Sequence, residues 1–581
     1  MKKIKYLFLL FFLVSLGCED FLDKEPLDII SDAAVWDDER LINSYLADLY
    51  YRTDFIEIRG NEAEQTSFAM VASMGGEGRS FGAHHQSYIA STNVITSSGV
   101  PEELDYWKYY IIRDCNYFIE KLQKSPIDKA IAEQRIAEVR FLRAYIYFQM
   151  VIRYGGVPII TEAQSIDATP EEIFVPRNSE KEVYDFIINE TTELTQILPS
   201  VYEAKDKGRP SKWAAYALLS RSSLYAASIA KYGQVQLSGL LGFQASDAGI
   251  YAQKSYDASK AIINNGIHFL YEVNPDPTAN FQNLFLDESA ANTEVIMAEV
   301  YDYSKNRAHA YTLRSMTHDH NGTWASMLYT YDFIERFEFA DGTPGNSITR
   351  AQLTATEWSA AELFANRDPR FKASVFYPEC PWQGGKAYFH SRTIRDGVTY
   401  TSGIAEDGWP YQSITRNNNR TGFMVRKRCN ENLKTTPVIN DDTDYIIFRL
   451  GEIYLNLAEA ALYLGYDVEA LDALNRVRER ADMPPKAAIT EDTIHNERLV
   501  ELTWENHSYW DMRRWRVAKS MLDGVRLKGL QYTYNYNTKK YKIALINAEG
   551  VARTFMDRNY YLPIGVSRVS ENPNFVENPD Y

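Results

Sequence analysis

Amphipathic segments that recur along the chain constrain its fold more than any other feature. In residues 137–158 the apolar side chains fall three or four positions apart, which is the spacing of one face of an α-helix. They are Ala137, Phe141, Tyr145, Phe148 and Ile152. Gly155, Gly156 and Pro158 then end the pattern. Similar segments occupy residues 180–198, 211–228 and 252–265 early in the chain, and 447–465, 468–481 and 492–515 late in it.

These predicted helices follow one another as hairpins. Ser179 and Pro199 bracket residues 180–198, and Pro210 with Ser211 opens the next helix. Helical hairpins with small and aromatic residues at their contacts resemble tetratricopeptide repeats, although no strict repeat period is present. We therefore expect a mostly α fold, with a tetratricopeptide-like helical-repeat scaffold over about residues 30–275 and 441–520.

The stretch between the two groups of helices, about residues 275–440, has a different composition. It is rich in Gly, Pro, Asn, Thr, Tyr and Trp, and its apolar runs are short. Long loop-rich segments on a rigid scaffold often carry binding residues. We interpret it as a long loop-rich insertion that carries short strands and ligand contacts.

The N-terminus is typical of a lipoprotein signal. Lys2, Lys3 and Lys5 precede an apolar run of 11 residues from Tyr6 to Leu16, well below the roughly 20 residues that a membrane-spanning helix needs. Gly17 and Cys18 follow, so we expect residues 1–17 to be removed and Cys18 to carry the lipid. Ordinary secretion, with cleavage near Gly17, is the alternative.

Charge and cysteine content exclude several classes of protein. Without the three signal lysines, 59 basic residues face 78 acidic ones, a formal charge of −19 compared with −16 for the full chain. Such an acidic chain is not expected to bind nucleic acid. Cys115, Cys380 and Cys429 remain after the signal, so at most one disulfide can form, and the sequence does not select the pair.

Carboxylates at helical spacing raise the possibility of catalysis. Glu452 and Glu459 share one helical face, and Glu497, Glu501 and Glu505 share another. A glycosidase uses two carboxylates about 5 to 9.5 Å apart, so spacing alone does not exclude hydrolysis. Arginines in the same helices favour interhelical ion pairs, which make carboxylates poor general acids; they are Arg449, Arg478, Arg480, Arg498, Arg513 and Arg514. We therefore expect a protein that is not an enzyme.

Metal and cofactor signals are weak. His84 with His85, and His318 with Asp319 and His320, have no third ligand at a suitable spacing. The acidic run Asp441, Asp442 and Asp444 has neither the Gly nor the distal Glu of a calcium loop. We expect no metal and no cofactor.

Ten segments, in order along the chain, resemble the SusD/RagB family. They are FLDKEP after Cys18, RFLRAYIYFQMVIRYGGVP, VPRNS (175–179), GRPSKWAAYALLSR (208–221), NRDPRF (366–371), YIIFRLGEIYLNLAEA (445–460), LNRVRERA (474–481), ERLVEL (497–502), YWDMRRW (509–515) and the terminal YLPIG...ENPNFVENPDY. The chain departs from the family pattern at Gly451, where Ala is usual, and at Glu577 and Asp580, where the ending QNPGY is commoner.

The resemblance implies a single SusD-like domain over residues 18–581. It further implies a nutrient-binding lipoprotein, usually for glycans, that caps a SusC-like TonB-dependent transporter with its helical repeats facing that partner. The acidic residues after Cys18 resemble the signal that sends lipoproteins of Bacteroidetes-type bacteria to the outer face of the outer membrane.

Glycan binding requires aromatic faces bordered by groups that hydrogen-bond hydroxyls, and two regions supply both. The first is the loop from Gly75 to Pro101, which in the family commonly contributes to the binding site, and the second runs from Tyr301 to Tyr331. The candidate ligand-binding residues are Arg79, Phe81, His84, Tyr88, Tyr303, His320, Trp324 and Tyr329. Trp324 is the strongest of them because Asn321, Gly322 and Thr323 before it are typical of an exposed turn. A weaker set is Trp382, Trp409 and Tyr411.

Two other functions stay open. In RagB-like members the same loops would hold a peptide, and a purely structural transporter lid would bind no nutrient. The sequence does not select among glucan, mannan, host glycan and plant polysaccharide as the ligand.

Overall fold

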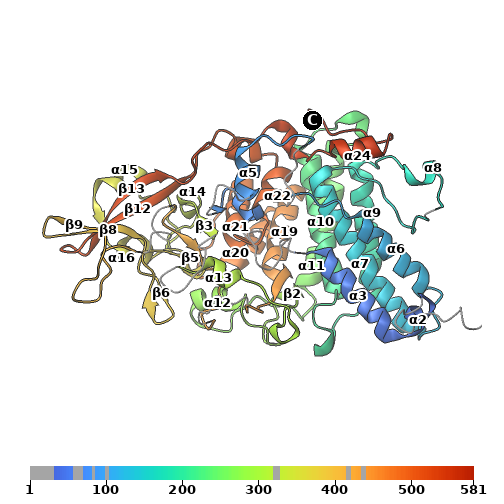
Figure 1. The fold of residues 1–581 in the computed structure, drawn as a ribbon, viewed down its shortest axis with the longest axis horizontal. Coiled ribbons are helices and arrows are strands. Elements are labelled where there is room, and N and C mark those ends of the chain that lie inside the picture. The colour runs from blue at the N-terminus through green and yellow to red at the C-terminus, as the bar shows by residue number, and fades with distance from the viewer. Residues whose placement is uncertain are drawn as a thin grey trace, which may run out of the picture.

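The computed structural model describes residues 32–55, 70–80, 86–98, 104–165, 167–317, 327–413, 420–433 and 440–581. Helices from the two ends of the chain pack together, and a sheet-rich lobe extends from them at the left of Figure 1. This arrangement confirms the predicted mostly α fold with a helical-repeat scaffold and a strand-bearing insertion. Over the described residues, no helix has both the length and the apolar composition needed to span a bilayer.

Four early scaffold helices overlap the predicted segments: α7 (Lys129–Tyr154), α9 (Glu180–Ile197), α10 (Lys212–Tyr232) and α11 (Ala248–Ile263). Helix α7 begins eight residues before the predicted segment 137–158. The sequence analysis gave no bounds for α2 (Asp32–Asp37), α3 (Glu39–Thr53) and α6 (Tyr109–Leu122). The Ser179 hydroxyl accepts from the Glu182 N–H at the start of α9, and Ser211 accepts from the Ala214 N–H at the start of α10. Helix α7 packs on α6 and α9, and α10 packs on α9 and α11.

Two late helices differ from the sequence-based prediction. They belong to the group α19 (Leu450–Leu464), α20 (Asp467–Arg480), α21 (Glu491–Glu501), α22 (Ser508–Arg514) and α23 (Ala518–Leu522). The predicted helix 447–465 begins only at Leu450, because residues 445–449 form a strand that pairs with another strand. The predicted helix 492–515 is broken into α21 and α22, since Trp504 and Asn506 have positive φ angles of 57° and 64°. The freed Trp504 N–H donates to the buried Glu77 carboxylate at 2.6 Å.

A five-stranded sheet forms the outer part of the lobe. Its order is β4-β13-β12-β8-β9, with β12 and β8 parallel and the other neighbours antiparallel. The strands are β4 (Glu357–Trp358), β8 (His390–Arg395), β9 (Val398–Tyr400), β12 (Lys528–Asn535) and β13 (Lys540–Asn547). The C-terminal hairpin β12–β13 therefore completes the sheet of the insertion, a pairing that the sequence analysis did not predict.

Shorter strands and helices complete the lobe and the scaffold. The short strands are β1 (Gly78–Ser80), β2 (Val295–Glu299), β3 (Met327–Tyr329), β5 (Val375–Phe376), β6 (Pro381–Trp382), β7 (Gly385–Lys386), β10 (Met424–Val425) and β11 (Tyr445–Arg449). The short helices are α4 (Met70–Met74), α5 (Gln86–Thr92), α8 (Pro170–Ile173), α12 (Pro277–Asn283), α13 (Tyr311–Ser315), α14 (Tyr331–Ile334), α15 (Arg350–Ala355), α16 (Ala360–Phe364), α17 (Pro369–Ser374) and α24 (Val566–Glu571). Helix α5 lies inside the Gly75–Pro101 segment, so that segment is not the continuous loop that the sequence analysis expected.

Candidate functional site

The two regions predicted to bind a ligand are joined at their bases. Strand β1 of the first region pairs antiparallel with β3 of the second, with Gly78 opposite Tyr329 and Ser80 opposite Met327. Gly78 permits this pairing, because a Cβ there would lie 2.0 Å from the Leu328 carbonyl oxygen. The chain therefore leaves β1 and enters β3 at adjacent positions.

Arg79 of β1 and Tyr88 of α5 lie together, and the Arg79 side chain is buried, with 5% of it exposed. The Arg79 guanidinium lies 5.4 Å from the centre of the Tyr88 ring and donates to the carbonyls of Ser80 and Ala548. Burial lowers the pKa of Arg79 to about 10, and the Glu549 carboxylate opposes that shift. Tyr88 is half-buried, so its ring keeps some access to solvent.

Tyr303 lies on a loop that three aspartates hold in place. Its side chain is 51% exposed. Asp444 Oδ1 accepts from the Tyr301 N–H at 2.9 Å, and Asp442 Oδ2 accepts from the Tyr303 N–H at 3.3 Å. Further along the same segment, Asp441 Oδ2 accepts from the Thr312 N–H at 3.0 Å. These contacts fix the backbone on both sides of the exposed tyrosine ring.

His309 is buried beneath this loop. Its Nε2 lies 2.8 Å from the Thr443 carbonyl oxygen, and its ring meets the Tyr301 ring edge-on at 4.8 Å. Burial lowers the pKa of His309, while the nearby Asp441 carboxylate opposes that shift. His309 therefore supports the loop from below as a neutral side chain.

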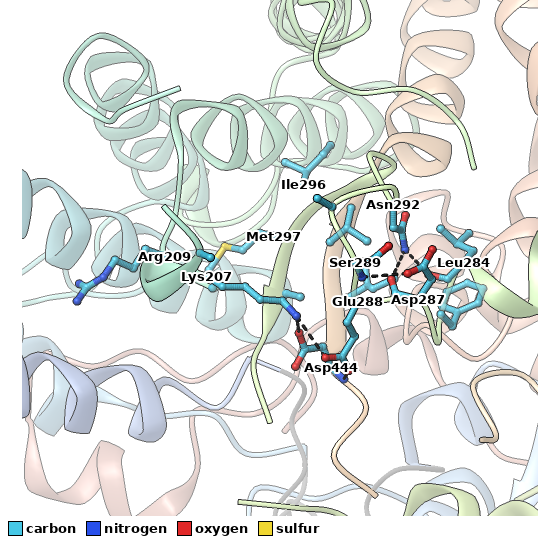
Figure 2. A pocket seen from close by; sticks show the side chains of 17 residues that line it. Lys207, Arg209, Leu284, Asp287, Glu288, Ser289, Asn292, Ile296, Met297 and Asp444 are labelled. Atoms are coloured by element: carbon cyan, nitrogen blue, oxygen red, sulfur yellow. Dashed lines mark hydrogen bonds and ion pairs between the residues drawn. The ribbon is translucent and has the colours of Figure 1, made fainter. Parts of the chain in front are cut away.

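Two cavities, of about 340 and 240 Å³, lie on either side of residues 207–209. The smaller one is lined by Val300 and Arg307, at the two ends of the loop that carries Tyr303 (residues 300–307, here called the tyrosine loop). Figure 2 shows the larger one, where the Lys207 ammonium extends to Asp444 at 2.6 Å and to Glu288 at 3.3 Å. Asp444 therefore ties the tyrosine loop to the scaffold through Lys207.

The smaller cavity contains a buried acid with an unusual pKa. Burial raises the pKa of Glu299 to about 7, although the ion pair with Arg307 opposes the shift. Arg307 also lies 5.1 Å from the centre of the Tyr301 ring. The arrangement offers hydrogen-bonding groups beside aromatic rings.

Several predicted site residues lie outside the described residues. They are Cys18, Phe81, His84, His320 and Trp324. Tyr329 does not face the surface, because its side chain is 0% exposed and its hydroxyl contacts Thr503 in the core. Trp382 of the weaker set is also in the core, whereas Trp409 and Tyr411 are half-buried against Tyr534 and Tyr400.

The helical carboxylates form the predicted ion pairs. Arg514 binds the two carboxylate oxygens of Glu459 through Nη1 and Nη2. Arg221, which the sequence analysis did not name, binds those of Glu452 through Nε and Nη2. Glu501 contacts Arg370, Arg449 and Arg480. Burial alone would raise the pKa of Glu459 and of Glu501, but the guanidinium groups hold both well below their usual range.

One arginine differs from that prediction. Arg513 donates to the carbonyls of Arg153 and Tyr560 instead of a carboxylate, and its guanidinium lies over the Tyr509 and Trp510 rings. Its place on α22 directs it away from the acids and toward the C-terminal segment.

The described residues contain neither a disulfide nor a cluster of potential metal ligands. Cys115, Cys380 and Cys429 are all buried and free. Within the described ranges, no three His, Cys, Asp or Glu side chains gather as metal ligands would.

Sequence reasoning missed the supporting residues Lys207, Asp442 and Asp444. The acidic run Asp441, Asp442 and Asp444 carries no local signal for these contacts. Asp442 and Asp444 bind N–H groups 139 and 143 positions away, and Lys207 lies more than 200 positions from Asp444.

Comparisons with known proteins give a consistent result. A family model described as "SusD family" matches residues 293–581, and one described as "Starch-binding associating with outer membrane" matches residues 20–224. The chain is 26% identical over 517 residues to a "SusD-like protein" of Bacteroides ovatus, covering 86% of this chain and 80% of that protein. It is 24% identical over 486 residues to "Starch-binding protein SusD" of Bacteroides thetaiotaomicron, covering 82% and 78%. A solved SusD-like protein from Bacteroides fragilis superimposes with a TM-score of 0.75 at 24% identity, covering 96% of this chain and all of that one.

Proposed function

This chain belongs to the SusD family, and from that membership we propose that it is a cell-surface lipoprotein that captures an oligosaccharide. The family includes a protein named for starch binding, and one family description places its members at the outer membrane. The acidic charge of −16 is compatible with a neutral glycan as ligand.

The exposed tyrosine on a rigid loop is the observation that carries this proposal. Asp442 and Asp444 bind the backbone N–H groups of residues 303 and 301, so the backbone that carries the Tyr303 ring is already ordered when the ring stacks on a sugar. Arg79, in the strand pair that joins the two predicted loops, lies beside Tyr88. We infer that these loops form one binding surface, to which Phe81, His84, His320 and Trp324 contribute.

Calorimetry on the full chain, purified in detergent, tests the proposal. The probes are maltoheptaose, laminarihexaose and mannohexaose. We expect at least one to bind, and Tyr303→Ala to weaken that binding about three- to tenfold, the effect of losing one stacking ring. The matched control is Tyr466→Ala, which removes a tyrosine that is 45% exposed on the α19–α20 turn.

Three results would contradict parts of the proposal. Hydrolysis of the bound sugar by the pure protein would make it an enzyme. Peptides that copurify with the protein, with no sugar bound, would favour peptide capture. Unchanged uptake by cells after removal of the loop aromatics would favour a purely structural lid.

We further propose that the protein delivers its ligand to a SusC-like TonB-dependent transporter while anchored through Cys18. A lipid tether keeps the binding protein at high local concentration beside its partner. Cys18→Ala should move the protein out of the outer-membrane fraction and lower uptake, while the affinity of the purified variant stays the same. A fall in that affinity would contradict the separate roles of tether and binding surface.

A further inference from the structure

An unusually long connection joins two neighbouring scaffold helices. Helix α7 ends at Tyr154 and α9 begins at Glu180, and among the described residues between them only Pro170–Ile173 is helical. Connections between packed helices are usually about 2 to 8 residues, and much longer ones tend to be functional. Figure 1 shows α6 and α8 at the end of the molecule opposite β8 and β9, with β3 between, so the strand pair β1–β3 that joins the proposed glycan loops lies away from this connection.

The connection is held firmly against helix α6. Asn116 donates to the carbonyls of Ile160 and Glu162 at 3.0 and 3.1 Å, and Glu120 accepts from the Ala163 N–H at 2.8 Å. At its start, the Tyr109 hydroxyl donates to the Pro158 carbonyl at 2.6 Å. These hydrogen bonds therefore order the connection against α6 without a ligand.

The C-terminal segment, residues 572–575, packs against the connection on the side of Val175 and against Trp107. Asn572 donates to the Val175 carbonyl at 3.0 Å, and Phe575 meets the Trp107 ring edge-on at 5.9 Å. Between α6, the connection and this segment lies a cavity of about 320 Å³. That volume falls within the range of small-ligand sites.

Aromatic rings supply much of the lining. Trp107, Tyr109, Tyr110 and Phe575 all border the cavity, and Tyr110 is 54% exposed at its mouth. The other borders carry Arg113, Glu162, Gln164 and Asn572. Rings surrounded by amide, carboxylate and guanidinium groups are suited to a ligand with an apolar face and a hydroxyl-bearing edge.

Charge narrows the ligand class. Arg113 and Glu162 carry opposite charges, and the other lining residues are neutral, so the cavity favours neither an anion nor a cation. A pyranose ring meets these requirements, since its C–H face stacks on aromatic rings and its hydroxyls both donate and accept. We propose that this pocket, formed by α6, the α7–α9 connection and residues 572–575, is a second binding site that takes one pyranose unit of a neutral oligosaccharide. This assignment rests on the proposed glycan-binding function.

Hydrogen–deuterium exchange on the full chain in detergent tests the second site. With maltoheptaose, laminarihexaose or mannohexaose present, we expect slower exchange in residues 107–113 and 158–175. Tyr110→Ala should abolish that protection and leave the protection of residues 301–312 intact. Tyr303→Ala should do the reverse, and Tyr466→Ala should change neither.

Each outcome separates the two proposals. Protection of residues 301–312 without protection of the pocket, for all three sugars, overturns the second site and leaves the proposed function standing. Protection of the pocket alone supports the second site and removes the tyrosine loop from the proposed function. Protection of neither region overturns both. Protection of the pocket by a tryptic digest of casein, and by none of the sugars, replaces the pyranose with a peptide and overturns the assignment.

Discussion

The buried acids of this protein differ in the groups that compensate for the burial of their carboxylates. Glu459 and Glu501 bind guanidinium groups, which keep them ionised. Glu77 instead accepts from the Trp504 N–H and lies 3.2 Å from the Thr503 hydroxyl, and burial raises its pKa to about 7. Hydrogen bonds from neutral donors offset only part of the cost of burying a charge.

The raised pKa of Glu77 predicts a pH-dependent stability. The folded state holds this proton more tightly than the unfolded state, so the stabilisation is complete below about pH 4.5 and is lost as the pH rises through about 7. Glu77→Gln is neutral at every pH. As the pH rises from about 4.5 to above 7, the free energy of unfolding of this variant should therefore increase by about 3 kcal/mol relative to that of the wild type. Urea denaturation of both proteins at about pH 4.5, 6 and 8 measures the difference. A difference in free energy of unfolding that is constant with pH would contradict the raised pKa of Glu77. The surface variant Glu203→Gln is the control, and its difference from the wild type should not change with pH.

Helix α19 begins inside the buried ion-pair cluster, which explains a departure from the family pattern. Gly451 stands where the family usually has alanine. A Cβ at this position would lie 2.2 Å from Arg449 Nη1 and 3.0 Å from both Glu294 Oε1 and Glu501 Oε1. The glycine therefore leaves room for the Arg449 guanidinium to reach its acids.

Gly451→Ala should destabilise the protein although alanine is the better helix former. We expect a loss of about 1 to 3 kcal/mol in the free energy of unfolding, because the buried arginine must shift. Gly249→Ala in α11 is the matched control, since nothing lies within 4 Å of its Cβ position, and it should stabilise by up to about 1 kcal/mol. Equal effects of the two variants in urea denaturation would refute the steric explanation.

At the scale of the whole molecule, buried charges connect the lobe to the scaffold. Arg370 of α17 contacts Glu497 at 2.5 Å and Glu501 at 3.0 Å, both in α21. Arg478 of α20 extends the link to Glu338 of the insertion at 2.9 Å. Breaking such a buried pair leaves a charge without compensation.

Arg370→Met should therefore lower the free energy of unfolding by about 3 to 5 kcal/mol. Lys540→Met removes the exposed pair with Glu362 and should cost no more than about 1 kcal/mol. Thermal and urea denaturation of both variants measure the contrast. A small effect of Arg370→Met would show that apolar packing, and not the ion pairs, joins the lobe to the scaffold.

Local sequence determined the scaffold helices and part of their chemistry. Spacing and capping residues placed α9, α10, α11 and α20 to within four residues and found α7 without its first eight residues, because a helix forms from contacts within a few residues. The arginines beside Glu459, Glu497 and Glu501 likewise predicted ion pairs. The candidate ligand residues remain predictions, and the fold buries the side chains of two of them, Tyr329 and Arg79.

Tertiary structure alone decided how distant segments meet. Strand β11 forms because it pairs with β2. The helix breaks at Trp504, where the freed N–H donates to the carboxylate of the distant Glu77. The C-terminal hairpin β12–β13 joins strand β8 of the insertion. The tyrosine loop depends on Lys207 through Asp444, and the aromatic pocket depends on Asn572 reaching Val175. Each of these pairings joins residues more than 100 positions apart, so no local periodicity encodes them, and only the packed chain brings their partners together.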